Sequence, residues 1–171
     1  TIIGILISNT SFLLAVYFLY KLIKMDYSDK VSFWSVLMLI FFPTSFYFGA
    51  VYTESLFLML SVSSFYFSRK GNFFIASVLA LFASATRIIG VLLFFSLAVE
   101  AWQQKKPLKD VLWIAISPFG LISYMFFLYL KTGDALVFYN SIGIFGEQRH
   151  KGIVLYPQIL YRYIKIMLTL N

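Results

Sequence analysis

Long apolar runs, separated by short turns that carry lysine and arginine, constrain this chain more than any other feature. The first run covers residues 1–23 and ends with Lys21 and Lys24 around a polar turn. A transmembrane helix needs about 20 consecutive apolar residues, so this run is long enough to cross a bilayer. Residues 1–20 lack a small-residue cleavage pattern, and we therefore expect a spanning helix here and not a signal peptide.

The composition argues against a water-soluble domain. Of the 171 residues, 61% are hydrophobic, 20% are aromatic and 12% are charged, whereas a soluble domain carries about 25% charged residues. Hydrocarbon leaves backbone polar groups unsatisfied unless the segments are helices or a closed barrel, and these runs lack the alternation of barrel strands. We therefore predict an all-α, polytopic transmembrane helical bundle with about six or seven membrane helices. Residues 1–171 are expected to form one transmembrane domain of a chain that is longer at both ends.

The basic residues predict which turns lie on the inner side of the membrane. The net charge is +7, and the positive-inside rule assigns this excess to topology and not to a nucleic-acid partner. The residues placed inside are Lys21, Lys24, Lys30, Arg69, Lys70, Lys105, Lys106 and Lys109.

This inner-side assignment constrains the rest of the topology. It requires residues 73–102 to form a helical hairpin that turns near Thr86 and Arg87, because about 30 residues are too many for one crossing and few for two. Residues 131–157 are then an extracytoplasmic loop. A last helix, within residues 156–171, either re-enters the membrane or lies on its surface, and the sequence leaves both open.

A polar break at residues 42–55 is the first place where we expect chemistry. Pro43 bends or ends a helix, which allows the residues after it to line a cavity. Glu54 follows near the point of re-entry, where an ionisable group suggests a functional, interior-facing position. The alternative is a helix cap, since Thr53 is a fair N-cap residue and an acid suits the first turn. One residue can serve both purposes.

Arg87 interrupts an apolar run with no acid close to it in the sequence. An arginine in that position needs a partner such as a carboxylate or a phosphate. Three alternatives stay open: Arg87 binds an anion, pairs with Glu54, or extends to the membrane interface. Asp134, just past an apolar run, is a second acid candidate, with a turn-forming role as its alternative. His150, the only histidine, is expected to be an exposed loop residue.

The aromatic residues and the possible metal ligands say less about function than Glu54 and Arg87 do. Tyr47, Tyr52 and Tyr139 are placed where they can line an outer cavity suited to a sugar or a prenyl chain, although core packing also explains each of them. Histidine, aspartate and glutamate form no metal-ligand spacing within one segment, and no glycine-rich phosphate loop occurs. The sequence has no cysteine and predicts no metal site.

Five segments, taken in order, resemble the PIG-V-type mannosyltransferases, which include GPI mannosyltransferase 2 and its prokaryotic relatives. The segments are SNTSFLL at 8–14, FPTSFYFGAVYTESLF at 42–57, SFYFSRKG at 64–71, ASATRIIG at 83–90 and TGDALVF at 132–138. The resemblance covers most of the chain, and its specificity comes from the joint pattern.

This resemblance implies a GT-C glycosyltransferase fold in a multi-pass membrane protein, in the cell membrane of a prokaryote or the endoplasmic reticulum of a eukaryote. It further implies inverting transfer of a sugar, mannose in this family, from a polyprenyl-phosphate-linked donor to a lipid or glycan acceptor outside or in the lumen. The family's catalytic acid lies in the first outer loop, which would precede Thr1, so catalytic residues are not assigned within this chain and this fragment alone is expected to be inactive.

The resemblance also implies roles for the candidate residues. Glu54 would bind acceptor hydroxyls or hold a divalent cation, and Arg87 would bind the donor phosphate, because inversion needs stabilisation of the leaving phosphate charge. The full substrate-binding set is Glu54, Arg87, Tyr52, Thr53, Tyr47 and Asp134. A transporter or flippase of lipid-linked substrates and a non-catalytic membrane assembly subunit are the alternative functions.

Overall fold

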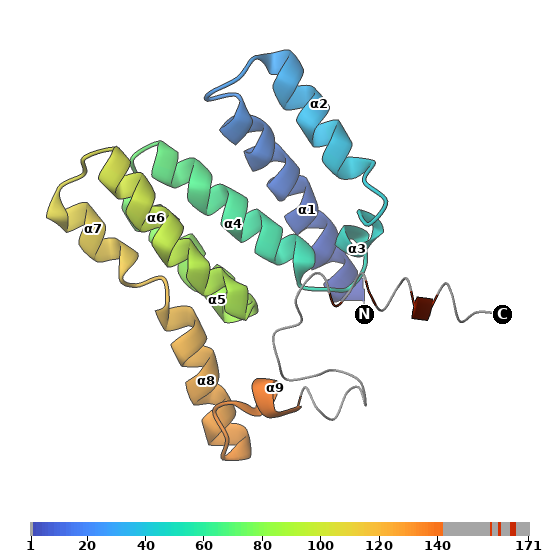
Figure 1. Cartoon of the computed structure of the whole chain (residues 1–171), viewed down its shortest axis with the longest axis vertical. Helices are drawn as coiled ribbons and strands as arrows, with labels where there is room; N and C mark the ends of the chain where they lie inside the picture. Colours follow the sequence, from blue (N-terminus) through green and yellow to red (C-terminus); the bar gives the residue numbers. More distant parts are fainter. Residues whose placement is uncertain (1, 142–157, 159–160, 162–164, 167–171) are drawn as a thin grey trace. The chain divides into compact units, whose positions relative to one another are not determined.

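The chain is helical throughout the described residues, with no strand among them (Figure 1). The computed structural model describes residues 2–141, 158, 161, 165 and 166. It divides into a first unit, Thr1–Met125, and a second unit, Phe126–Asn171. The helices are α1 (Ile2–Ile23), α2 (Asp29–Ile40), α3 (Phe46–Gly49), α4 (Glu54–Arg69), α5 (Phe73–Thr86), the 3₁₀ helix η1 (Ile88–Val91), α6 (Leu92–Gln103), α7 (Leu108–Ile114), α8 (Phe119–Thr132) and α9 (Val137–Asn140).

The all-helical prediction is confirmed, but the number of full-length spans is smaller than predicted. Two helices in the described part of the chain are long and apolar enough to cross a membrane, Ile2–Ile23 and the continuous stretch Leu108–Thr132. The others are shorter: α4 has 16 residues and α5 has 14. At 1.5 Å per residue, a 16-residue helix is about 24 Å long, less than the ~30 Å hydrocarbon core. The difference arises because polar and proline breaks divide the apolar runs.

One such break lies at Pro43. Helix α2 ends at Ile40 and the short helix α3 begins at Phe46, with Pro43 between them. Proline disfavours helical conformation in the residue before it and lacks the amide hydrogen that the next turn would need. The predicted break at Pro43 is therefore confirmed, and it falls before the proline and not within a continuous helix.

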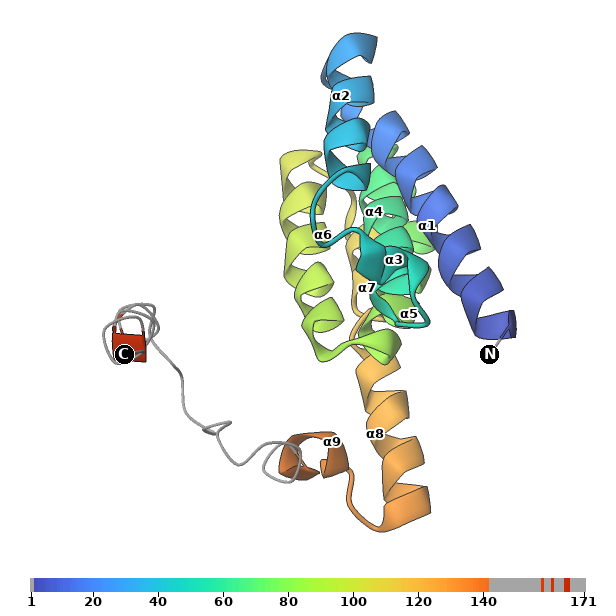
Figure 2. The ribbon, with the colours of Figure 1, turned by 90° about the vertical axis from the view of Figure 1, so that its right-hand side faces the viewer.

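The second break confirms the predicted hairpin within residues 73–102. Helix α5 ends at Thr86, and Arg87 has extended backbone angles, φ −147° and ψ 138°. Helices η1 and α6 then run back along α5. Helix α4 lies between α1 on one side and the α5–α6 pair on the other (Figure 2).

The interior of the first unit combines an apolar cluster, which includes Leu60, Phe73 and Leu97, with many small side chains. Its buried polar residues are all serines: Ser8, Ser11, Ser32, Ser55, Ser63, Ser64, Ser68, Ser77, Ser84 and Ser117. Several hydroxyls hydrogen-bond to a neighbouring helix, as Ser64 Oγ does to the Ala76 carbonyl at 2.8 Å. Small residues let helix backbones approach closely, which is how membrane helices associate.

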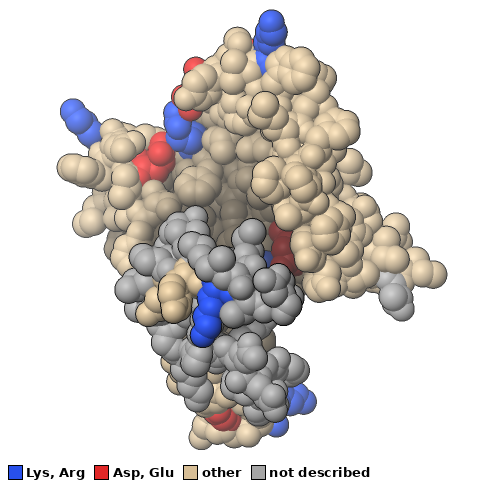
Figure 3. All heavy atoms as spheres, turned by 45° about the vertical axis from the view of Figure 1, so that its right-hand side comes forward, with Lys and Arg blue, Asp and Glu red and all other residues tan. Residues whose placement is uncertain are grey.

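Large apolar side chains, in contrast, cover the outside. Among the exposed ones are Leu13, Met38, Phe95 and Trp102, at 60–80% of their full accessible area. In Figure 3, most of the described surface on the visible face carries no charged residue. Single exposed apolar residues are normal on any protein, but an apolar exterior around a serine-rich interior suits a lipid environment.

The turns that carry the lysines and arginines meet at one end of the first unit, which we call the basic end. Arg69, at the end of α4, forms ion pairs with Asp26 at 2.6 Å and with Glu100 at 3.4 Å. Lys106 Nζ lies 3.4 Å from the Gly71 carbonyl oxygen. The turns after α1, α4 and α6 are thus joined to one another.

The second unit contains the end of α8, a turn and α9. Gly133 has φ +74°, a left-handed conformation that favours glycine and follows the last residue of α8. The expected extracytoplasmic loop, residues 131–157, is described as far as residue 141. His150 and most of the expected last helix lie outside the described residues.

Candidate functional site

The candidate site centres on an ion pair between Glu54 and Arg87. Glu54 is the first residue of α4, and Arg87 lies between α5 and η1. Glu54 Oε1 accepts a hydrogen bond from Arg87 Nη1 at 2.8 Å, and the two side chains are 34% and 40% exposed. Of the three alternatives for Arg87, the structure therefore shows the pairing with Glu54.

This pair lies at the end of the first unit opposite the basic end. Glu54 begins α4 and Arg69, which belongs to the basic end, is its last residue. Within residues 2–125, every other charged side chain belongs to the turns or helix termini at the basic end. Glu54 and Arg87 are thus an isolated pair of charges at an otherwise uncharged end of this unit.

Arg87 is held by the backbone around it. Its amide donates to the Ala83 carbonyl at 3.1 Å, and its own carbonyl accepts from the Gly90 amide at 2.9 Å. Gly90 is buried, and a Cβ there would lie 2.6 Å from the Ala83 backbone, so only glycine lets η1 pack this closely on α5. The guanidinium carbon lies 5.9 Å from the centre of the Phe57 ring, within cation–π range.

Two serines position Glu54 by binding the turn between α3 and α4. One, Ser55, follows Glu54 in α4, and the other, Ser8, belongs to α1. Ser55 Oγ donates to the Phe48 carbonyl at 2.6 Å. Ser8 Oγ, from α1, lies 2.6 Å from the Ala50 carbonyl and 3.2 Å from Ser55 Oγ. Both serines are buried. They fix the turn that leads into α4, and with it the position of the Glu54 backbone.

The cap alternative for this stretch is only partly right. Thr53 occupies the N-cap position, but its side chain makes no capping hydrogen bond, and its backbone is helical with φ −84° and ψ −4°. An N-cap side chain reaches the amides of the first turn from an extended backbone, which Thr53 does not have. Glu54 does lie in the first turn, where its charge suits the helix dipole.

One oxygen of the Glu54 carboxylate remains without a partner among the described residues. Oε1 is bound to Arg87, whereas Oε2 is buried and accepts no hydrogen bond there. A buried, unsatisfied carboxylate oxygen costs free energy, and it is an acceptor ready for a hydroxyl or water donor. The observation suits a group that receives a ligand hydroxyl.

Tyr47 and Tyr52 lie beside each other near this turn. Their ring centres are 5.9 Å apart, and the two side chains are 44% and 58% exposed. They are therefore available to a ligand and are not core residues. Tyr139 is also exposed, but it belongs to the second unit.

Asp134 belongs to the second unit and has a turn-forming role there. Its carboxylate accepts hydrogen bonds from the Leu136 amide at 2.8 Å and from Asn140 Nδ2 at 2.7 Å. These two donors, the amide foremost, lower the pKa of Asp134 from its ordinary value. The turn-forming alternative is what the structure shows, and all the observed contacts of this carboxylate are local.

The residues described around Glu54 bring together no ligand set for the divalent cation that the resemblance allows, and this cation stays a prediction. No group of three or more histidine, aspartate or glutamate side chains comes together in the part of the chain that the structure describes. Glu54 offers a single carboxylate, and one of its oxygens already faces a guanidinium. A hard cation needs several oxygen ligands and is repelled by the arginine.

Comparison with protein-family models, with curated proteins and with solved structures gives no match for this chain. The resemblance to PIG-V-type mannosyltransferases, and the functions that it implies, stay predictions.

Sequence reasoning missed Ser8 and Ser55 as the residues that fix the turn before Glu54. A signal for them exists, because a serine inside an apolar helix marks a helix contact more often than a lipid-facing position. It also missed Gly90. A glycine three residues after the break at Arg87 indicates a close backbone approach.

Proposed function

We propose that the chain is a multi-pass integral membrane protein with its basic end on the cytoplasmic side. Support comes from the apolar exterior, the serine-rich helix contacts and the two helices of spanning length. The clustering of the basic turns at one end supports the orientation, since cytoplasmic loops carry an excess of lysine and arginine. The shorter helices would span with the help of local thinning of the bilayer.

We further propose that the chain forms the substrate-binding part of a glycosyltransferase that uses a polyprenyl-phosphate-linked sugar, with mannose as the sugar that the motifs favour. The observation that carries this proposal is the isolated Glu54–Arg87 pair at the end opposite the basic turns. Ionisable groups placed apart from the basic turns of a membrane protein suggest a functional role by default, and within residues 2–125 these two have no other charged neighbour at their end of the unit.

The roles of the two residues follow from their hydrogen-bonding capacity. An arginine carries five N–H donors, and in the structure Arg87 gives one of its Nη1 hydrogens to Glu54. The others are free to bind the donor phosphate. Glu54 orients the guanidinium through Oε1 and offers Oε2 to an acceptor hydroxyl.

In the reaction, the acceptor oxygen forms a bond to the anomeric carbon of the sugar as the bond from that carbon to the phosphate oxygen breaks. The bonding electrons pass to the leaving phosphate, whose added negative charge Arg87 stabilises. The acceptor proton goes to a general base that is not assigned among the described residues.

Transfer from a polyprenyl-phosphate-linked sugar, measured with the natural full-length protein in membranes, tests this proposal. We expect Arg87→Ala to lower the rate by about 10²-fold or more, the size seen when one charge-stabilising donor is removed. Glu54→Gln should lower it less, because the amide still accepts a hydrogen bond. Arg69→Ala is the matched control, since Arg69 is also an ion-paired arginine but lies at the basic end.

Wild-type rates in both Arg87→Ala and Glu54→Gln would overturn the assignment of these residues. Movement of the intact lipid-linked sugar across proteoliposomes, without any glycosidic product, would overturn the transferase and favour a flippase.

A further inference from the structure

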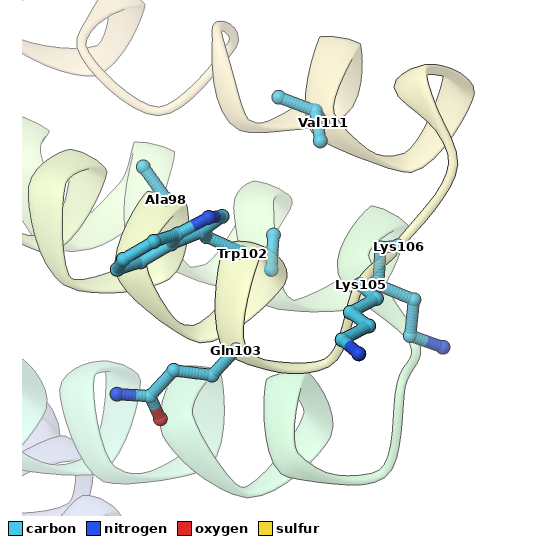
Figure 4. A pocket seen from close by; sticks show the side chains of 7 residues that line it. Ala98, Trp102, Gln103, Lys105, Lys106 and Val111 are labelled. Atoms are coloured by element: carbon cyan, nitrogen blue, oxygen red, sulfur yellow. The ribbon is translucent and has the colours of Figure 1, made fainter.

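A cavity opens between α6 and α7, at the basic end of the first unit and away from Glu54 and Arg87 (Figure 4). Its volume is about 720 Å³, within the range of about 300–1,000 Å³ that small-molecule sites occupy. The residues that line it are Ala98, Ala101, Trp102, Gln103, Lys105, Lys106 and Val111.

The walls of this cavity are apolar and its rim is cationic. Ala98 and Trp102 face it from α6 and Val111 from α7, whereas Lys105 and Lys106 lie in the turn that joins the two helices (Figure 4). The small alanine side chains leave room between the helices. The cavity therefore suits an amphiphile that has an apolar chain and an anionic head.

Trp102 marks the level at which the head would lie. Its side chain is 80% exposed, although it is one of the largest apolar groups in the chain. Tryptophan is enriched at the membrane interface, where its ring lies at the level of the lipid headgroups. Trp102 lies near the end of α6, three residues before Lys105, so the indole and the two lysines all belong to the basic end of the unit.

Lys105 adopts a conformation that costs free energy. Its φ is +51°, and it is the only residue other than glycine with positive φ in the described chain. The Lys105 amide donates to the Trp102 carbonyl and the Lys106 amide donates to the Ala101 carbonyl, both at 3.0 Å. This pattern is a Schellman motif, in which glycine is the usual residue at the left-handed position. Glycine would adopt this left-handed conformation at a lower cost in free energy. The lysine at this position instead places a cation at the rim of the cavity.

The Lys105 charge is available for a ligand. No salt bridge joins Lys105 to any residue within 2–125. The nearby acid Glu100 is already engaged by Arg69 and by Gln104. Lys106 is partly committed, since its ammonium lies 3.4 Å from the Gly71 carbonyl oxygen and 5.8 Å from the centre of the Phe73 ring.

We propose that this cavity is a binding site for an anionic phospholipid of the cytoplasmic leaflet. The headgroup phosphate binds Lys105, with Lys106 beside it, and an acyl chain lies against Ala98 and Val111. This inference rests on the membrane embedding proposed above and is independent of transferase activity. Basic turns are attracted to anionic membranes in general. The inference goes further, because it names one site at which a single lipid is retained.

Lipid titrations followed by native mass spectrometry, on the full chain in detergent, test this site. The probes are phosphatidylglycerol and phosphatidylcholine, which differ in headgroup charge. The variant is Lys105→Gly, which removes the cation and also places the preferred residue at the left-handed position, so the fold is retained or stabilised. The matched control is Lys30→Gln, which removes one exposed cation from the same end of the unit without touching the cavity.

We expect the wild-type chain to bind phosphatidylglycerol more tightly than phosphatidylcholine. Lys105→Gly should weaken phosphatidylglycerol binding roughly fivefold, the size expected for one lysine near an anionic surface, and leave phosphatidylcholine unchanged. Lys30→Gln should bind both lipids as the wild type does. Thermal unfolding of Lys105→Gly at or above the wild-type temperature shows that the loss is not one of folding.

Three results would overturn the site. Equal binding of the two lipids would show that headgroup charge is not recognised, and unchanged phosphatidylglycerol binding in Lys105→Gly would show that this cation is not used. Full displacement of the lipid by free glycerol phosphate would show a site for soluble phosphate. Binding of neither lipid would instead contradict the membrane embedding on which the inference rests, whereas loss of sugar transfer leaves these measurements unaffected.

Discussion

Glu54 Oε1 and Arg87 Nη1 lie 2.8 Å apart, although 33 residues separate them in the sequence. The pair joins the start of α4 to the break between α5 and η1. Both side chains are more than a third exposed. Ion pairs of that exposure contribute about 0–1 kcal/mol to the free energy of unfolding in water. Ser8 and Ser55 fix the turn before α4, and Gly90 packs η1 on α5, so the backbone on each side of the pair is held by contacts other than the pair itself.

Exchanging the two charges separates a structural from a functional role. In the double variant Glu54→Arg with Arg87→Glu, the ion pair re-forms with opposite direction. We expect the free energy of unfolding, measured by thermal unfolding in detergent, to lie within about 0.5 kcal/mol of the wild type, since an exposed pair contributes little. Sugar transfer should fall to the level of Arg87→Ala, because a carboxylate then faces the donor phosphate. Restored transfer in the double variant would mean that the pair acts only as a contact between helices.

Removing a hydroxyl from the serine pair should loosen the turn before α4. Ser55→Ala deletes the hydroxyl that donates to the Phe48 carbonyl at 2.6 Å and leaves that carbonyl with only the longer contact from Ser8 Oγ, at 3.0 Å. We expect a loss of about 1 kcal/mol in the free energy of unfolding, measured by denaturant titration in detergent micelles. Ser96→Ala is the control, because the Ser96 hydroxyl bonds only within its own helix, to the Leu92 carbonyl. Equal losses in the two variants would contradict the specific role of Ser55.

Adding one methyl group at Gly90 should displace Arg87. The new Cβ would lie 2.6 Å from the Ala83 carbonyl oxygen, which is backbone and cannot rotate away. We expect Gly90→Ala to destabilise by about 1–3 kcal/mol, as overpacking does, and to weaken binding of a donor analogue. Gly49→Ala is the matched control, because nothing lies within 4 Å of the Cβ that it would add. Unchanged unfolding of Gly90→Ala would show that η1 can move off α5 without cost.

The turn at Asp134 should depend on pH in a defined direction. Hydrogen bonds from the Leu136 amide and Asn140 hold the pKa of Asp134 below its ordinary value of 3.8. A lowered carboxyl pKa means that the stabilisation is complete above the ordinary value and is lost as the pH falls through the lowered one.

The Leu136 amide reports this titration by NMR. Its chemical shift should move with a titration midpoint below 3.8, the ordinary value of an aspartate carboxyl. In Asp134→Asn the side-chain oxygen still accepts the hydrogen bond but does not titrate, so the pH-dependent movement should disappear. Titration of the Leu136 amide at or above pH 4 would contradict the lowered pKa.

The helical class and the positions of the breaks follow from the sequence. Apolar runs and the absence of strand alternation predict helices, and Pro43 and Arg87 each interrupt a run at a point where the structure changes direction. The number of full spans does not follow, because composition counts apolar residues but not the turns that divide them. Residues 73–102 illustrate this, since they contain enough apolar residues for a crossing but are divided at Arg87.

Parts of the candidate site required the structure. Pairing of Arg87 with Glu54 was one of three alternatives, and only tertiary packing decides which partner a charge reaches. The left-handed conformation of Lys105 has no sequence signal, since the residue that signals a left-handed helix end is glycine. The local role of Asp134, in contrast, follows directly from the Gly-Asp pair after an apolar run.

The buried serines have a consequence for how the helices find their alignment. Alanine and serine surfaces are nearly smooth, and two such helices can slide along each other by one turn with little change in shape complementarity. Hydroxyl groups such as those of Ser64 and Ser84, which reach the Ala76 and Ser117 carbonyls, find their acceptors in one alignment only. Directional bonds therefore help to select the register of this bundle, beside the packing of its larger buried side chains such as Phe73 and Leu97. A bulky apolar substitution at these serines would remove that selection as well as the space.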